Sequence, residues 1–345
     1  MAKTMNPKAR TIVNPMLDPF LERIVTPFSA RYHLLGSQFS LESNDRRLMR
    51  LCAHAFSGLP RHRFPGGSDR LQIRLILHDI DAKPAGQRKG LAPELRTYGW
   101  NNVFGATMGP DTLALLSPPT GFGLIVVSKP MLAFPYQLRY ELIEFSAFVL
   151  AARRRDLVPL HGACIALNGQ GVLLLGDRGA GKSVTSLACL ADGFEFVAED
   201  GLVVCPTTLL TSGLSSFLHL RADSLHLFHG LTKAHRMLKS PTIVRRSGVA
   251  KVEIDVRKIG VELARSSVEI RAIVFLSGRK SRSAGLATPL ARTVARDWLA
   301  QSQPYASSLP QWRTFARRIS GVPAYAVARG DQPQDIVAAI REILA

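Results

Sequence analysis

The stretch that decides the fold reads GDRGAGKS and runs from Gly176 to Ser183. It matches the pattern G-x-x-x-x-G-K-[S/T], in which a glycine-rich loop wraps phosphate groups. The apolar run Val172–Leu175 in front of it is typical of a buried strand. Behind it, apolar residues recur at helical spacing over residues 184–191, and Asp192-Gly193 is expected to end that helix. Strand, glycine loop and helix therefore follow one another as phosphate binding requires.

Each residue type in this loop has a predicted role. Glycine tolerates positive φ, so the backbone N–H groups of the loop can point at phosphate oxygens, helped by the positive end of the following helix. Lys182 is predicted to contact the β- and γ-phosphates, and the Ser183 hydroxyl is predicted to bind Mg²⁺. The alternative is a glycine-rich turn that binds nothing. The predicted nucleotide-binding residues are Gly176, Asp177, Arg178, Gly179, Ala180, Gly181, Lys182, Ser183 and Val184.

Two acidic residues follow the next predicted strand. The run Phe194–Ala198 reads as this strand, and it leads directly into Glu199 and Asp200. Carboxylates at the end of a strand beside a phosphate loop can hold Mg²⁺ or accept the proton of an attacking hydroxyl. We therefore predict Ser183, Glu199 and Asp200 as metal ligands and Asp200 as a catalytic residue. A solvated acidic turn is the alternative.

The strand before the glycine loop is predicted to form a hairpin with its predecessor. His161–Leu167 reads as a strand, and Asn168–Gly171 is a strong turn signal directly before the loop strand. The two strands should therefore pair antiparallel, whereas most phosphate-loop proteins enter this strand within a parallel sheet. His161 lies at the start of the first strand, but its distance from the phosphates depends on a register that the sequence leaves open.

The run from His161 to Val204, HGACIALNGQGVLLLGDRGAGKSVTSLACLADGFEFVAEDGLVV, resembles the catalytic core of HPr kinase/phosphorylase and its relatives. The resemblance implies an α/β fold with a C-terminal PEP-carboxykinase-like P-loop domain that has a mixed sheet. It implies a cytoplasmic kinase that uses ATP and Mg²⁺ to phosphorylate a serine of a protein or peptide. By position, Lys182 would bind the transferring phosphate and Ser183 the Mg²⁺. Asp200 would accept the proton, and His161 would be the active-site histidine.

Three departures from the family pattern limit what the resemblance implies. Glu199 stands where the family more often has Asp, and His219-Leu220-Arg221 stands at a Glu-Ile-Arg segment whose Glu helps to hold the metal. Arg245-Arg246-Ser247-Gly248 matches the arginine-bearing loop only loosely. The resemblance leaves Arg221, Arg245 and Arg246 as candidate catalytic cations. The departures argue against the reverse, phosphate-removing reaction and against HPr itself as the substrate.

The length and composition predict a two-domain α/β protein. The chain has 345 residues, of which 46% are hydrophobic. We expect a poorly structured segment over residues 1–30, a smaller α/β domain for recognition or assembly over 31–155, and the catalytic domain over 156–345. Pro159 interrupts the helical pattern at this boundary. The other predicted elements are strands at 31–40, 71–77, 268–276 and 324–328, helices at 45–56, 136–155, 288–301, 309–319 and after 331, and a hairpin at 112–128.

Several classes of protein are disfavoured. No apolar run reaches the roughly 18 residues of a membrane span, and the first residues lack the apolar core of a signal peptide. The four cysteines show no metal-binding spacing, which favours free thiols in a reducing cytosol. His219, His226, His229 and His235 fall within one window, but no cysteine accompanies them, so polar surface or core histidines are favoured over a zinc site.

The net charge of +18 requires a decision about partners. Phosphate neutralisation would favour nucleic acid, but no aromatic-rich RNA-binding signature accompanies the arginine clusters. An acidic protein or peptide phosphoacceptor, together with a solvated arginine-rich surface, is therefore preferred. Whether the chain forms a homo-oligomer stays open at this point. Three alternative functions also remain: a nucleotide-binding regulatory protein with reduced catalysis, a small-molecule kinase, and a nucleic-acid-binding NTPase.

Overall fold

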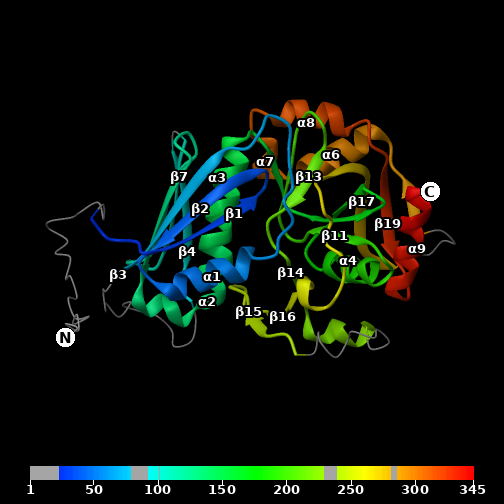
Figure 1. Cartoon of the computed structure of the whole chain (residues 1–345). Coiled ribbons are helices and arrows are strands. Elements are labelled where there is room, and N and C mark those ends of the chain that lie inside the picture. Colours follow the sequence, from blue (N-terminus) through cyan, green and yellow to red (C-terminus); the bar gives the residue numbers. More distant parts are fainter. Residues whose placement is uncertain (1–22, 79–91, 101, 229–238, 281–285) are drawn as a thin grey trace, which may run out of the picture.

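The computed structural model of this chain describes residues 23–78, 92–100, 102–228, 239–280 and 286–345 (Figure 1). Most of the segment 1–30, as well as His229 and His235, lies outside these residues. The described part is a mixed α/β protein with three sheets of seven, nine and three strands. The predicted α/β class is therefore confirmed.

The seven-stranded sheet takes up the first part of the chain, at the left of Figure 1. Its order is β1-β2-β3-β7-β6-β5-β4, with β2, β3 and β7 parallel and the other neighbours antiparallel. The strands are β1 Phe28–Leu34, β2 Ser37–Ser43, β3 Arg70–His78, β4 Leu95–Trp100, β5 Val103–Met108, β6 Leu113–Ser117 and β7 Phe122–Ser128.

One prediction in this region is wrong and two are confirmed. The single strand predicted at 31–40 is wrong: the chain turns at Leu35-Gly36, and β1 pairs antiparallel with β2. Both turn residues have positive φ, which matches a tight hairpin turn. The helix at 45–56 is confirmed as α1 (Arg46–Phe56), since the Asp45 side chain accepts a hydrogen bond from the Arg47 N–H and caps it. The hairpin at 112–128 is also confirmed, as β6 and β7.

A long helix packs against this sheet, and its hydrogen-bonding pattern changes along its length. After η1 (Lys129–Ala133) it begins as α2 (Pro135–Gln137), widens into the π-helical segment η2 (Leu138–Glu144) and continues as α3 (Phe145–Arg154). The predicted helix at 136–155 is thus confirmed apart from the π segment. Single π turns within α-helices often occur at functional sites. Here the wide turn carries Arg139 and Tyr140.

The nine-stranded sheet holds the glycine loop. Along its main path the order is β11-β9-β10-β17-β13-β12-β8, and β19 joins β17 and β18. The predicted hairpin is confirmed, because β9 pairs antiparallel with β10 across a turn in which Asn168 and Gly169 have positive φ. On its other side β10 runs parallel to β17. The strands are β8 Val158–Leu160, β9 Ala163–Leu167, β10 Gln170–Leu175, β11 Glu195–Ala198, β12 Leu202–Val204, β13 Leu210–Gly213, β17 Val268–Lys280, β18 Ala287–Pro289 and β19 Ala324–Arg329.

Helices pack on both sides of this second sheet. The helices are α4 Lys182–Ala191, η4 Val256–Lys258, α6 Arg292–Ser302, α7 Pro304–Ser307, α8 Trp312–Ile319 and α9 Pro333–Leu344. The helix predicted at 288–301 starts later than expected, because residues 287–289 pair with β19 as strand β18. At α9 a capping box forms between Gln332 and Asp335.

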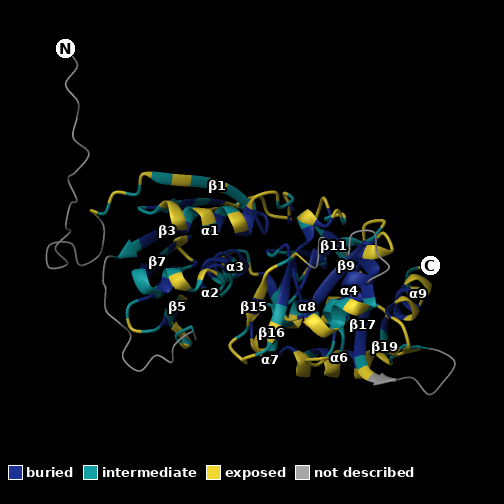
Figure 2. Ribbon diagram, turned by 90° about the horizontal axis from the view of Figure 1, so that it is seen from below, coloured by how far each residue is buried: buried dark blue, intermediate teal, exposed yellow. Residues whose placement is uncertain are grey.

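A three-stranded sheet lies between the two halves of the molecule, at the bottom of Figure 1. It consists of β14 (Phe217–Leu220), β16 (Ala250–Asp255) and β15 (Thr242–Val244), all antiparallel, and η3 (Ala222–Phe228) follows β14. Buried apolar clusters lie between each large sheet and the helices that pack on it, as the buried ribbon in Figure 2 shows. The small sheet therefore stands where polar residues of both halves can meet.

Candidate functional site

The glycine loop connects β10 to α4 in the geometry of an anion cradle. Gly176, Gly179 and Gly181 have φ of 144°, 89° and 100°, conformations that side chains rarely adopt. A methyl group at Gly176 would come within 2.6 Å of the Leu276 carbonyl, whereas nothing lies within 4 Å of the positions a methyl group would take at 179 and 181. The loop therefore needs glycine for its backbone at all three positions and leaves open space beside two of them.

Two side chains at the start of α4 face the loop and the acidic strand end. The Lys182 ammonium donates to the Gly176 carbonyl at 2.6 Å, so it lies over the loop. Burial lowers the pKa of Lys182, while Asp200 and Glu199 oppose this with their charges. The Ser183 hydroxyl donates to the Glu199 carboxylate. Loop, helix and acidic strand end are therefore in direct contact.

Asp200 lies on a strained turn directly after β11. Its φ is +69°, in the left-handed region that Asp tolerates better than most residues. The Gly201 N–H donates to the Glu199 carbonyl at 2.8 Å and closes the turn. Strained conformations of this kind are concentrated at functional sites. The turn sends Glu199 into the interior and leaves the Asp200 side chain 28% exposed.

Three groups surround the Asp200 carboxylate. Its Oδ2 accepts from the Tyr140 hydroxyl and, at 3.2 Å, from an Arg245 Nη2. His161 Nδ1 lies 3.6 Å from Oδ1 and 2.9 Å from the Asp200 carbonyl oxygen. Burial acts to raise the pKa of Asp200, but the charge of Arg245 and the Tyr140 hydrogen bond hold this pKa at about 2. The carboxylate is therefore ionised at neutral pH.

Hydrogen bonds between the Gln303 side chain and the backbone of His161 hold this residue beside Asp200. The Gln303 side chain accepts from the His161 N–H at 2.7 Å and donates to the His161 carbonyl at 2.9 Å. His161 lies just before β9 rather than within it, and the pairing of β8 with β12 and of β9 with β11 brings it to the site, a point that the sequence left open. Because Nδ1 donates to a carbonyl, the neutral ring carries its free lone pair on Nε2.

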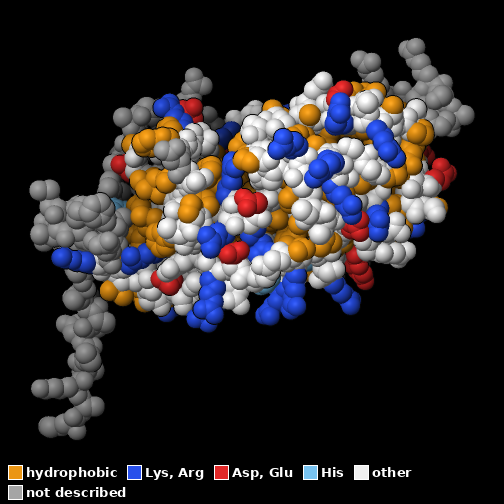
Figure 3. All heavy atoms as spheres, turned by 90° about the horizontal axis from the view of Figure 1, so that it is seen from above, with side chains coloured by type: hydrophobic (Ala, Val, Ile, Leu, Met, Phe, Trp, Pro, Cys, Tyr) orange, Lys and Arg blue, Asp and Glu red, His pale blue; other side chains and the backbone are white. Residues whose placement is uncertain are grey.

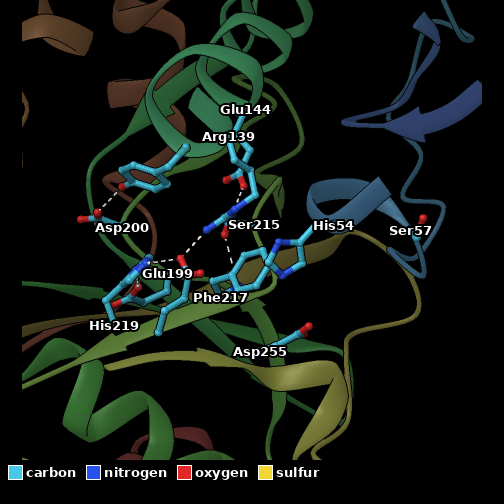
Figure 4. A network of polar contacts seen from close by, with 12 residues as sticks. His54, Ser57, Arg139, Glu144, Glu199, Asp200, Ser215, Phe217, His219 and Asp255 are labelled. Atoms are coloured by element: carbon cyan, nitrogen blue, oxygen red, sulfur yellow. Dashed lines mark hydrogen bonds and ion pairs between the residues drawn. The ribbon is translucent and has the colours of Figure 1, made fainter. Parts of the chain in front are cut away.

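A chain of buried charged side chains extends from Glu199 toward the first half of the molecule (Figure 4). His219 on β14 lies between two carboxylates, with Nδ1 3.4 Å from Glu199 and Nε2 3.1 Å from Glu253 on β16. Arg139 then joins Glu253 to Glu144 through two hydrogen-bonded ion pairs. Burial acts to lower the pKa of His219, but hydrogen bonds to the two carboxylates raise it above its ordinary value.

The β15–β16 hairpin covers the glycine loop. Its turn supplies Arg245, and the Ser247 hydroxyl accepts from Arg178 of the loop at 2.9 Å. Lys251 on β16 is half-buried, and burial lowers its pKa while the nearby Glu199 and Asp200 carboxylates act against this. A second lysine therefore stands near the acidic pair, besides Lys182.

Two of the predicted cations point elsewhere. Arg221 pairs with Asp223 at 2.7 Å, and its side chain is 65% exposed. Arg246 donates to Glu141 at 2.7 Å and to the Pro93 carbonyl, so it joins the two halves of the molecule. Arg245, in contrast, lies on Asp200 itself. The structure thus separates the three arginines that the sequence left as alternatives.

Sequence reasoning missed four residues of this cluster: Arg139, Tyr140, Lys251 and Glu253. Arg139 and Tyr140 lie in the helix predicted at 136–155, which the sequence pattern did not connect with the site. The charged residues Arg139 and Glu144, placed among apolar residues of this helix, were the signal that could have identified it. Lys251 and Glu253 alternate along β16, so they share one face of the strand. The sequence shows this alternation, but it does not show which residues this face of the strand contacts.

Among the described residues, no group of three or more His, Cys, Asp or Glu side chains is arranged to hold a metal ion. All four cysteines are buried free thiols, as predicted. On the face shown in Figure 3, lysines and arginines are spread among apolar and neutral side chains. No helix in the described part of the chain is long and apolar enough to span a membrane.

The fold and the site thus define a mixed α/β protein with a glycine loop set against an acidic strand end. Comparison with known proteins shows which proteins parts of this chain resemble. The chain is 28% identical over 137 residues to the HPr kinase/phosphorylase of Lactobacillus delbrueckii subsp. bulgaricus, which is 39% of this chain and 36% of that protein. It is 50% identical over 44 residues to the HPr kinase/phosphorylase of Malacoplasma penetrans, 13% of this chain and 15% of that protein. These matches support an HPr kinase-related family for this chain.

The Hpr(Ser) kinase/phosphatase from Coxiella burnetii is similar with 14% sequence identity and a TM-score of 0.28, over 53% of this chain and 94% of that one. No protein-family model matches the chain. The matches span only about a third or less of the curated relatives' own length.

Proposed function

We propose that this protein is an ATP- and Mg²⁺-dependent kinase that phosphorylates a seryl hydroxyl of a protein or peptide in the cytoplasm. Residues 156–345 would form a PEP-carboxykinase-like catalytic domain, and residues 31–155 a domain for recognition or assembly. The observation that carries the proposal is the contact of Ser183 with Glu199, directly beside the ionised Asp200. A phosphoryl-transfer site needs a phosphate cradle, a metal-binding hydroxyl and a base at this spacing.

The residues present fit ATP and Mg²⁺. The open space beside Gly179 and Gly181 leaves room for phosphate oxygens against the loop backbone. Ser183 and Glu199 would supply two oxygen ligands to Mg²⁺, which usually keeps several waters and takes its remaining ligands from phosphates. A magnesium site of this kind does not need a cluster of three acidic or histidine side chains, and the described residues contain no such cluster. When bound, ATP supplies the phosphoryl group that is transferred.

The side chains of this site then have separate roles. Asp200 is the base for the acceptor hydroxyl, and Oδ1 is its freer oxygen, because Tyr140 and Arg245 both bind Oδ2. Lys182 moves its ammonium from the Gly176 carbonyl to the phosphates, and Arg245 and Lys251 add positive charge nearby. The net charge of +18 favours an acidic phosphoacceptor, and nucleic acid is not proposed as a partner.

Labelled-phosphate transfer tests the proposal. The protein is incubated with γ-labelled ATP, Mg²⁺ and candidate polypeptides, and the label is located by mass spectrometry. Transfer to a serine is expected, and Lys182→Ala should abolish it, whereas Lys258→Ala, at an exposed lysine, should not. ATP turnover that is the same in wild type and Lys182→Ala would refute the enzymatic role.

One observation favours a second candidate, a nucleotide-binding regulatory protein with reduced catalysis. His219 occupies the place of the family's metal-binding Glu and is bound between two carboxylates. In that case Mg-ATP would bind and stabilise the protein without transfer of phosphate to any polypeptide. Saturable ATP binding in the absence of both turnover and transfer would decide for this candidate.

A further inference from the structure

We propose that Tyr140, which the long helix of the first half brings to the site, is a positioning residue that orients Asp200 for catalysis. The inference rests on the proposed kinase function and deepens it, because it makes the two halves of the chain parts of one site. Tyr140 lies 60 residues before Asp200, and its hydroxyl donates to Oδ2 of that carboxylate.

The hydrogen bond selects which carboxylate oxygen is free. Tyr140 and Arg245 converge on Oδ2, so this oxygen has two donors and little capacity left for a third. Oδ1 lies 3.6 Å from Nδ1 of His161, whose side chain is 63% exposed. An acceptor hydroxyl would therefore approach Oδ1. Without the phenol, the carboxylate could rotate about its last bond and present either oxygen.

The tyrosine ring is itself held in place from several sides. Tyr136 stacks on it at 5.5 Å between ring centroids with 10° between the planes. The Arg245 guanidinium lies 4.8 Å from its centroid, and His219 meets it edge-on at 5.6 Å. The phenol therefore has little freedom to move away from Asp200, which is what an orienting donor requires.

The helix that carries Tyr140 is anchored next to it. Arg139 and Glu144 are five residues apart and form an ion pair within the π-helical segment, whose hydrogen bonds have the same i to i+5 spacing. Arg139 also binds Glu253 of the small sheet. The wide turn is therefore fixed to the second half one residue before the tyrosine.

The chain offers a matched control. Tyr136 is stacked on Tyr140 and also lies edge-on to His219, but its buried hydroxyl has no hydrogen-bond partner among the described residues. Tyr140→Phe removes a hydroxyl that binds Asp200, whereas Tyr136→Phe removes one that binds none of the described residues. Both changes keep the stacked pair of rings. The comparison therefore isolates the hydrogen bond from the packing.

The test measures steady-state ATP turnover with Mg²⁺ in the full-length chain. Hydrogen bonds to charged groups contribute about 1.5–3 kcal/mol, so kcat of Tyr140→Phe should fall about 10- to 150-fold. KM for Mg-ATP should stay near the wild-type value, and Tyr136→Phe should resemble wild type in both kcat and KM. Equal kcat for Tyr140→Phe and Tyr136→Phe would overturn the inference.

A double substitution separates positioning from a general structural effect. If Tyr140 acts only through the carboxylate, Tyr140→Phe should cost little further activity in an Asp200→Asn background. A fall by the same factor in both backgrounds would assign Tyr140 a structural role and refute the inference. Wild-type protein that binds Mg-ATP but shows no turnover would instead overturn the kinase proposal on which the inference rests.

Discussion

Replacement of Arg139 by Met tests the buried connection between the two halves of the molecule. Met has a similar length and no charge, so packing changes little while the ion pairs disappear. The Arg139 side chain is 2% exposed, and those of Glu144 and Glu253 are 6% and 5% exposed. The substitution therefore leaves Glu144 without its cationic partner and Glu253 with His219 alone.

The structure allows an estimate of the loss. Removing one partner of a buried ion pair costs about 3–5 kcal/mol. Glu253 keeps the hydrogen bond to His219, which moves the expected value toward the lower end. The lost contact of the Arg139 guanidinium with the Phe217 ring, 4.0 Å from its centroid, adds about 1 kcal/mol. We therefore expect the free energy of unfolding at pH 8 to fall by about 4 kcal/mol.

The loss should depend on pH with a definite sign. In wild type, burial acts to raise the pKa of Glu253, but His219 and Arg139 hold it below its ordinary value. Burial already raises the pKa of Glu144 against the charge of Arg139. Without Arg139 both pKa values rise above the unfolded value of about 4.3. The folded variant then binds protons more readily than the unfolded chain, so its deficit should shrink as the pH falls from 8 to 5.

Urea unfolding followed by circular dichroism at pH 8 and pH 5 measures both effects. Arg96→Met is the matched control, because Arg96 and Glu94 form an ion pair whose side chains are 66% and 72% exposed, and its loss should not move the midpoint. Adding Glu144→Gln to the variant should restore part of the stability. A loss below about 1 kcal/mol, or one that does not change between the two pH values, would refute the reasoning.

Three further predictions concern the site itself. Gly181→Ala should lower the free energy of unfolding by about 1–2 kcal/mol in urea titrations, because of its φ of +100°, and weaken Mg-ATP binding, whereas Gly278→Ala, a glycine without positive φ, should do neither. Gln303→Leu leaves the His161 backbone groups unpaired and should cost about 1–3 kcal/mol in the same titrations. Chelation of Mg²⁺ should abolish ATP turnover, and added Mg²⁺ should restore it, as a coupled assay for ADP release would show.

The parts of the site that lie close together in the sequence were predictable from it. The Asn168-Gly169 turn, the glycine loop and the helix after it depend on local backbone preferences, and all three form as expected. The short distance from Lys182 to Asp200 along the chain also made their association foreseeable. Local patterns missed the turn at Leu35-Gly36, because the apolar residues on both sides of it read as one strand.

The parts that join distant segments were not predictable in this way. Arg139 and Glu253 are 114 residues apart, and Tyr140 and Asp200 are 60 apart. Their meeting depends on how the small sheet packs between the halves, which no periodicity encodes. Arg221 shows the converse: it matches the family motif by position, yet it lies at the surface with Asp223.

The register of the small sheet explains how the site accommodates His219 in place of a carboxylate. His219 lies directly opposite Glu253 in the β14–β16 ladder, so a carboxylate is present one strand away from the expected place. That carboxylate is not free, because its Oε2 is bound by both His219 and Arg139. Glu253 therefore holds the imidazole and the helix rather than a metal. In the proposed kinase, Ser183 and Glu199 would supply the protein oxygens for Mg²⁺, and the ion would complete its shell with phosphate and water.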